Sequence, residues 1–256
     1  MTATAIETRR CAQIEQGSLT SAATAGNLLD RFPAYGAGLD WVRRFVLRPH
    51  PDLGRTGAVC PRLGAALRAD LVWLVTIRTG RTTPVHAAGV GELLAATFHQ
   101  QVGDDPARVR AGAVLAFFPD VPAELAGDFI DGGHRLLRRW FVAAGLMLGD
   151  FHPDSGVGSV HNPALPVMRS PDPMFAVRAL SRHDLLFLDT EQTPRGQRLD
   201  YLRLYRRRLA PQLAPAELAD LDARIAALLD DASTSPFLSA DDIDGAGSLV
   251  GGGRVR

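Results

Sequence analysis

The chain has 256 residues, 46% of them hydrophobic, which is enough for one domain with a sizeable core. The 28 basic residues balance the 28 acidic ones, so no net field attracts nucleic acid or an anionic membrane, and we expect neither as a partner. All the basic residues are Arg, and the lack of Lys excludes a Schiff-base lysine, a Walker-type phosphate lysine and a lysine general base.

Targeting and redox signals are weak. Residues 1–16 are polar, and no apolar run approaches the ~20 residues of a membrane helix, so we expect neither a secretory leader nor a membrane span. Cys11 and Cys60 are the two cysteines and form no C-x-x-C pair. These features predict a protein of the reducing cytoplasm.

The first part of the chain reads as an extension followed by a helix and a strand. We expect residues 1–36 to form an N-terminal extension that contains only a short helix near 20–32. Apolar residues at helical spacing predict a helix over 39–47, which Pro49 ends. The β-branched and aromatic run over 70–78 predicts a buried strand.

The middle of the chain alternates between helix and strand signals. Residues 85–101 place apolar side chains on one helical face, and 113–118 form a second strand-like run. Pro122 suits the first position of a longer helix, and a third strand is predicted over 146–151.

The last part of the chain reads as a strand and two helices. We expect a strand over 174–180, with a further short strand at 185–188. Helical periodicity over 195–209 and 216–229 predicts a pair of helices. From 231 to 256 the composition of Ser, Asp and Gly predicts a disordered tail.

This order of elements predicts an α+β fold. We expect a single α+β domain over residues 37–230, with one mixed or antiparallel sheet, helices over one face of it, and the helical pair at its C-terminal end.

Polar residues gather on two proline-rich loops. The first covers 50–61, with the sequence HPDLGRTGAVCP. The second covers 151–171 and carries the segments FHP, VHNP and MRSP. Because proline stiffens a loop and loops on a rigid scaffold carry function, we expect the two loops to face each other and form the site.

Three residues of these loops are candidates for catalysis or metal ligation. The sequence allows three roles for Cys60: a nucleophile, a thiolate ligand to haem iron, or a buried thiol that packs a turn. His152 ends a predicted strand, where it serves as an axial iron ligand, as a general base, or as a hydrogen-bonded histidine without a chemical role. His161 is the alternative ligand.

Three arginines complete the predicted site. Arg55, Arg169 and Arg178 lie in or beside the loops, and a guanidinium can clamp a carboxylate or a haem propionate with two hydrogen bonds. The run Arg206–Arg208 is assigned to a solvated helix face.

Two segments resemble the YqcI/YcgG family, which includes haem-dependent N-oxygenases. They are VCPRLGAALR, from Val59 to Arg68, and NPALPVMRS, from Asn162 to Ser170. Pro61 follows Cys60 instead of preceding it, and Leu165 stands where the family places a histidine, so the resemblance does not assign the haem ligand. The chain is still more similar to a group of domains of unassigned function with the signatures H-P-D-L-G-R-x-G-x-V-C-P and F-H-P.

The resemblance implies a haem-dependent oxygenase that oxidises a nitrogen of a small amino-acid-like substrate in specialised metabolism. Iron would be held by His152, His161 or Cys60, with Arg55 and Arg169 on the propionates and Arg178 on the substrate carboxylate. The electron donor and a homodimeric state stay open. Two alternatives are a cofactor-free binding or accessory protein, with the loops as its interaction surface, and a transferase with Cys60 as nucleophile and His152 as base.

Overall fold

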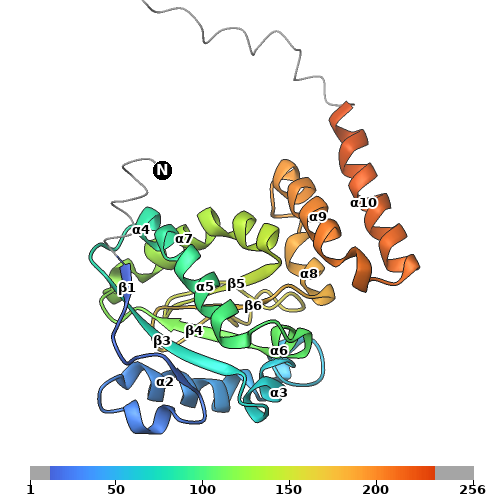
Figure 1. Cartoon of the computed structure of the whole chain (residues 1–256). Helices are drawn as coiled ribbons and strands as arrows, with labels where there is room; N and C mark the ends of the chain where they lie inside the picture. The colour runs from blue at the N-terminus through green and yellow to red at the C-terminus, as the bar shows by residue number, and fades with distance from the viewer. Residues whose placement is uncertain (1–11, 234–256) are drawn as a thin grey trace, which may run out of the picture.

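The computed structural model describes residues 12–233 and shows one mixed sheet with helices around it, which confirms the predicted α+β class (Figure 1). The six strands in this part of the chain are β1 (Ala12–Ile14), β2 (Thr20–Ser21), β3 (Val72–Thr79), β4 (Ala113–Phe117), β5 (Leu146–Phe151) and β6 (Met174–Ala179). Its α-helices are α2 (Pro33–Trp41), α3 (Leu63–Arg68), α4 (Pro84–Gly89), α5 (Gly91–Val102), α6 (Pro106–Ala111), α7 (Ala123–Ala144), α8 (Leu185–Leu188), α9 (Arg195–Leu209) and α10 (Pro215–Ser233). Beyond Ser233, the tail predicted over 231–256 lies outside the described residues.

Three strands of the sheet, β3, β4 and β5, run in the same direction. Its strand order is β1-β3-β4-β6-β5, with β2 also paired to β3. β3 and β4 are parallel, and β6 runs antiparallel to both β4 and β5. The carboxyl ends of β3, β4 and β5 therefore lie at the same edge of the sheet, which is where side chains that follow parallel strands are brought together.

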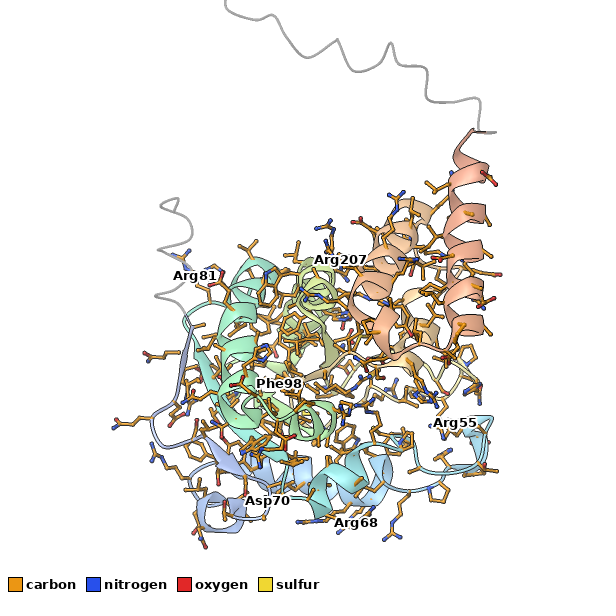
Figure 2. All side chains as sticks on the ribbon, turned by 45° about the vertical axis from the view of Figure 1, so that its right-hand side comes forward. Arg55, Arg68, Asp70, Arg81, Phe98 and Arg207 are labelled. Carbon is orange, nitrogen blue, oxygen red and sulfur yellow. The ribbon has the colours of Figure 1, made fainter. Side chains whose placement is uncertain are left out.

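Helices cover both faces of the sheet, so the expectation that they cover only one is wrong. Successive side chains of each strand point to opposite faces of the sheet, and both faces are apolar. Helices α4, α5 and α7 pack on one face, and α2 and α3 pack on the other (Figure 1). Figure 2 shows Phe98 of α5 inside the first of these layers, whereas Arg55, Arg68 and Arg81 lie at the periphery. A near-continuous apolar run such as β3 is typical of a strand buried on both faces.

The longest helix, α7, packs very closely on α4. A Cβ at Gly133 would lie 2.4 Å from the Cβ of Ala87, and one at Gly132 would lie 2.6 Å from Cγ of Pro84. Only glycine permits this approach of two helix backbones. The helix predicted over 85–101 is therefore two helices, α4 and α5, which meet near Gly89.

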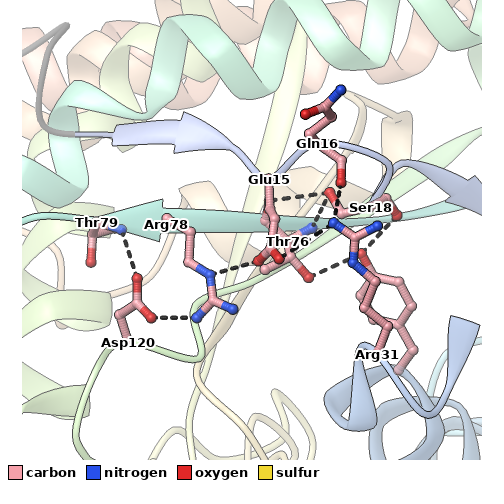
Figure 3. A network of polar contacts seen from close by, with 9 residues as sticks. Glu15, Gln16, Ser18, Arg31, Thr76, Arg78, Thr79 and Asp120 are labelled. Carbon is pink, nitrogen blue, oxygen red and sulfur yellow. Dashed lines mark hydrogen bonds and ion pairs between the residues drawn. The ribbon is translucent and has the colours of Figure 1, made fainter.

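The N-terminal segment contributes strands as well as a helical turn, contrary to the expectation of a short helix alone. β1 and β2 both pair antiparallel with β3. Figure 3 shows the polar contacts that attach this segment: Nε of Arg78 donates to Glu15 at 2.6 Å, and Arg78 also pairs with Asp120, which follows β4. Ser18 exchanges two hydrogen bonds with the backbone of Thr76, at 3.2 and 3.3 Å. These strands are too short to show the alternation that predicts a strand.

The C-terminal helices form the predicted pair, α9 and α10, beside the end of α7 (Figure 1). The buried carboxylate of Asp189 connects both helices to the domain, because it accepts from Arg198 of α9 at 2.6 Å and from Arg224 of α10 at 2.9 Å. The short strand expected at 185–188 is wrong: these residues form α8, whose Leu188 packs with the helical pair.

Candidate acid–base site

The candidate site lies at the carboxyl end of β5, under helix α7. Residues Leu146 and Leu148 of β5 belong to the core that α7 covers, whereas Phe151 lies against Trp41 of α2 on the opposite face. Since side chains alternate along a strand, Asp150 and His152 face α7 together. Two titratable side chains are thus brought into an otherwise apolar layer.

Helix α7 supplies the partners of both side chains. Nε2 of His152 lies 3.2 Å from Oδ1 of Asp131, and Nδ1 of His134 lies 3.2 Å from Oδ2 of Asp150. Asp131 and His134 are three residues apart, so they share one face of the helix. We call these four residues, Asp131, His134, Asp150 and His152, the acid–base cluster.

The acid–base cluster is buried and incompletely hydrogen-bonded. The side chain of His152 is 4% exposed and that of Asp150 is 12% exposed, whereas the Asp131 side chain is 36% exposed. Within residues 12–233, seven buried side-chain nitrogen or oxygen atoms lack a hydrogen bond, and four of them belong to the cluster: Oδ1 of Asp131, Nε2 of His134 and both ring nitrogens of His152. Buried polar atoms are nearly always paired in native proteins, so these four atoms make the cluster the candidate functional site of the described residues.

The environment of Asp131 favours its protonated form. Burial raises the pKa of this carboxyl group and the nearby Asp150 carboxylate raises it further, whereas His152 and Arg135 act in the opposite direction. The pKa of Asp131 is therefore raised overall, which suits a group that exchanges protons closer to neutral pH.

The two proline-rich loops meet beside the cluster, as predicted. Nδ2 of Asn162 donates to the carbonyl of Asp52 at 2.7 Å, and a Cβ at Gly54 would lie 2.8 Å from the Cβ of His161. Gly54 has φ +77°, a conformation that favours glycine. The contact between the loops therefore depends on this glycine.

His152 joins the strand to the second loop. Its carbonyl accepts from the backbone N–H groups of Ser155 and Ser170, at 3.2 and 3.4 Å. Nε of Arg169 donates to the carbonyl of Ser155 at 3.0 Å. Arg169, which lies on the surface, thus holds the turn that follows His152.

The other predicted arginines also have protein partners. Arg55 donates to the carbonyls of Thr56 and Val59 in its own loop, at 2.9 Å each. Arg178 forms a two-point ion pair with the buried carboxylate of Asp184, at 2.5 and 2.7 Å. Burial alone would lower the pKa of Arg178, but Asp184 raises it above its ordinary value. The two-point clamp of Arg178 is therefore occupied by Asp184.

Cys60 and Arg178 lie together, but they are not near His152. Both line a pocket on the face of the sheet that carries α3. Arg178 pairs with Met147 across β5 and β6, five residues before His152. At ~3.3 Å per residue, this places the two sites roughly 16 Å apart along the strand, on opposite faces. The tertiary structure therefore does not bring His152 to Cys60.

Sequence reasoning missed Asp131, His134, Asp150 and Arg62. The spacing of Asp150 and His152 by two residues on a strand, and of Asp131 and His134 by three on a helix, is the signal that could have found the cluster. Arg62 lines the Cys60 pocket and was visible only as a neighbour of Cys60 in sequence.

A search of residues 12–233 for three or more His, Cys, Asp or Glu side chains placed to hold a metal ion finds no such group. Among these residues, no helix is both long and apolar enough to cross a bilayer.

A family model, that of a domain of unknown function (DUF6875), matches residues 37–219. The chain belongs to this family. The match begins in α2 and ends in α10, so the DUF6875 domain includes β3 to β6, the acid–base cluster and both proline-rich loops. The chain matches no curated protein and no solved structure.

Proposed function

We propose that this DUF6875 chain is an enzyme that carries out acid–base chemistry on a small, polar, amino-acid-like substrate, with the acid–base cluster as its proton-transfer centre. The observation that carries the proposal is the pair of His152 and Asp131: the His152 side chain is 4% exposed, its Nε2 lies 3.2 Å from Oδ1 of Asp131, and its Nδ1 has no hydrogen-bond partner. An imidazole kept in this state costs folding free energy, which is the kind of cost that functional sites bear.

The four residues have different roles in this proposal. Asp131 is the member in contact with solvent, so its carboxylate meets the substrate and accepts the proton. Nε2 of His152 lies 3.2 Å from Oδ1 of Asp131. It shares the proton that Asp131 accepts and stabilises the negative charge of the Asp131 carboxylate. His134 and Asp150 form the second pair, which keeps a negative charge near Asp131 and so keeps its pKa raised.

The haem-dependent N-oxygenation that the resemblance implies stays a separate proposal, and His152 does not fit as its ligand. The ring lies beside the backbone of α7, since a Cβ at Gly127 would lie 3.6 Å from Cε1 of His152. A porphyrin plane could not approach either ring nitrogen unless α7 moved away. We therefore assign His152 to proton transfer and derive no step through haem; His161 and Cys60 remain the predicted alternative ligands.

The transferase alternative has one observation in its favour, because Cys60 lines a pocket together with Arg62 and Arg178. Its base would have to be a group other than His152, given the separation of the two sites. Full turnover by Cys60→Ala would contradict this alternative.

The test is a turnover screen of the full chain with amino acids and with amino-acid derivatives that carry amine or guanidine groups, followed by mass spectrometry. Asp131→Asn and His152→Gln should each reduce turnover by at least about 100-fold, because a positioned proton-transfer group contributes roughly that much. His99→Gln is the control, since it removes an exposed imidazole of α5 away from the acid–base cluster and should retain turnover. Equal turnover by all four proteins would contradict the proposal.

A visible spectrum with a pyridine haemochrome assay separates the acid–base reading from the oxygenase reading. A stoichiometric Soret band, together with oxygen-dependent addition of oxygen to the substrate, would favour N-oxygenation. Turnover by a colourless protein without added hemin would favour acid–base chemistry. Binding of a panel member without turnover would favour the third reading, a cofactor-free binding protein.

A further inference from the structure

The pocket around Cys60 lies on the face of the sheet opposite the acid–base cluster and forms where three segments meet. Cys60, Arg62, Leu63 and Ala66 come from the first loop and α3, Ala111 to Ala113 from the end of α6 and the start of β4, and Arg178 from β6. The pocket is small and partly open to solvent. Ala113 and Arg178 are cross-strand neighbours, so the floor of the pocket is the sheet itself.

The charges around this pocket do not balance in the described part of the chain. Arg178 has a carboxylate partner, Asp184. No ion pair within residues 12–233 joins Arg62 to a carboxylate; a terminal nitrogen of Arg62 donates instead to the carbonyl of Arg110 at 2.5 Å. Of the two guanidinium groups that line the pocket, only that of Arg178 therefore pairs with a carboxylate.

The electrostatics of Arg62 agree with this geometry. Burial lowers the pKa of Arg62, and repulsion from Arg178 lowers it further, whereas Asp184 and Cys60 act in the opposite direction. A bound anion would relieve this repulsion. The other lining side chains, Leu63, Ala66, Ala111 and Ala113, are apolar and suit a short hydrocarbon group.

We propose that the pocket of Cys60, Arg62 and Arg178 binds a short aliphatic carboxylate of two to four carbons, with its carboxylate on Arg62 and its hydrocarbon end on the alanines. Arg62 is the principal ligand because Arg178 is held by Asp184, and a guanidinium binds a carboxylate through two parallel hydrogen bonds. The pocket does not depend on the acid–base cluster, so this proposal stands or fails separately from the proposed function.

Cys60 provides a reporter for occupancy. The rate at which neutral iodoacetamide alkylates Cys60 in the full chain is measured by peptide-resolved mass spectrometry. The measurement is made at matched ionic strength with one of three additions: propionate, its neutral isostere propionamide, or inorganic phosphate. Propionate should slow the modification of Cys60 by at least about three-fold at saturation, and propionamide should leave the rate unchanged. Equal rates with propionate and propionamide, or stronger protection by phosphate, would overturn the proposal.

Variants locate the site. Arg62→Gln should abolish the protection by propionate, whereas Arg68→Gln, which removes an exposed charge from helix α3 directly after Arg62, should retain it. Protection that survives in a folded Arg62→Gln protein would overturn the assignment of Arg62. If circular dichroism shows that Arg62→Gln does not fold, the comparison of propionate with propionamide on the unmodified chain still decides the proposal.

Discussion

Single buried carboxyl groups in this protein differ in how their charge is compensated. Asp189 has two arginine partners: burial would raise its pKa, but Arg198 and Arg224 lower it overall. Asp131 lies near a second carboxylate, and its pKa is raised although His152 and Arg135 act in the opposite direction. The difference is that two arginines donate hydrogen bonds to the Asp189 carboxylate, which stabilises it as an anion.

Asp131→Asn should not destabilise the protein at neutral pH. The pKa of Asp131 is raised in the folded state, so the folded protein binds the proton of this carboxyl group more tightly than the unfolded protein does. The stability that this proton contributes falls as the pH rises from about 3.8, the ordinary pKa, to the raised pKa. The melting temperature of Asp131→Asn relative to the unmodified protein should therefore increase as the pH rises through this window. Asp128→Asn, an exposed carboxyl group of the same helix, is the control. A melting temperature difference that falls with rising pH would contradict the assignment.

At the scale of elements, close contact between α4 and α7 places the acid–base cluster. The glycines of α7 that touch α4, Gly132 and Gly133, follow directly after Asp131 and precede His134. A Cβ at Gly133 would also lie 3.3 Å from Cζ of Phe175 of β6, so the same surface of α7 lies close to the sheet that carries Asp150 and His152. Helix α7 therefore both packs against α4 and supplies two of the four residues of the acid–base cluster.

Gly133→Ala should destabilise the protein, whereas Gly127→Ala should not. A methyl group at Gly133 would lie 2.4 Å from the Cβ of Ala87, so the helices would have to separate, at a cost of about 1–3 kcal/mol. A methyl group at Gly127 meets Cε1 of His152 at an ordinary 3.6 Å, and alanine favours a helix by up to about 1 kcal/mol. Urea unfolding of both variants measures the difference. Equal free energies of unfolding would show that the helices have room at Gly133.

At the scale of the whole molecule, the N-terminal and C-terminal segments are attached to the domain by charged side chains. Arg78 of β3 pairs with Glu15, which follows β1, and with Asp120, which follows β4 (Figure 3). Asp189 connects the loop after α8 to both C-terminal helices. These contacts add to apolar packing, which for the C-terminal helices is a cluster of their own around Tyr201, Leu202 and Tyr205.

Asp189→Asn should loosen the C-terminal pair. Removal of the charge leaves Arg198 and Arg224, whose side chains are 25% and 48% exposed, without their shared anion, and loss of a charged hydrogen-bond partner costs about 1–3 kcal/mol. Since the pKa of Asp189 is lowered, this stability is present above the ordinary value of 3.8 and is lost as the pH falls through the lowered pKa. Hydrogen exchange at pH 7 should show faster exchange in α10 for Asp189→Asn and little change for Asp222→Asn, whose pair with Arg206 is exposed. Faster exchange in both variants would contradict a special role for Asp189.

The sequence by itself determined the local elements. Strand β5 and helix α9 have the predicted bounds, since apolar alternation and helical periodicity are properties of neighbouring residues. The proline-rich composition of the sequence also predicted loops at 50–61 and 151–171, whose contact through Asn162 and Asp52 is a property of the tertiary structure.

Only the tertiary structure decided the composition of the two candidate sites. Whether Arg178 or His152 shares a site with Cys60 depends on the sheet face to which each side chain points and on the register of β5 with β6. Whether His152 has a partner depends on where α7 crosses β5. Both properties arise from contacts between residues that are far apart in sequence. Patterns among neighbouring residues, such as alternation or helical periodicity, carry no information about such contacts.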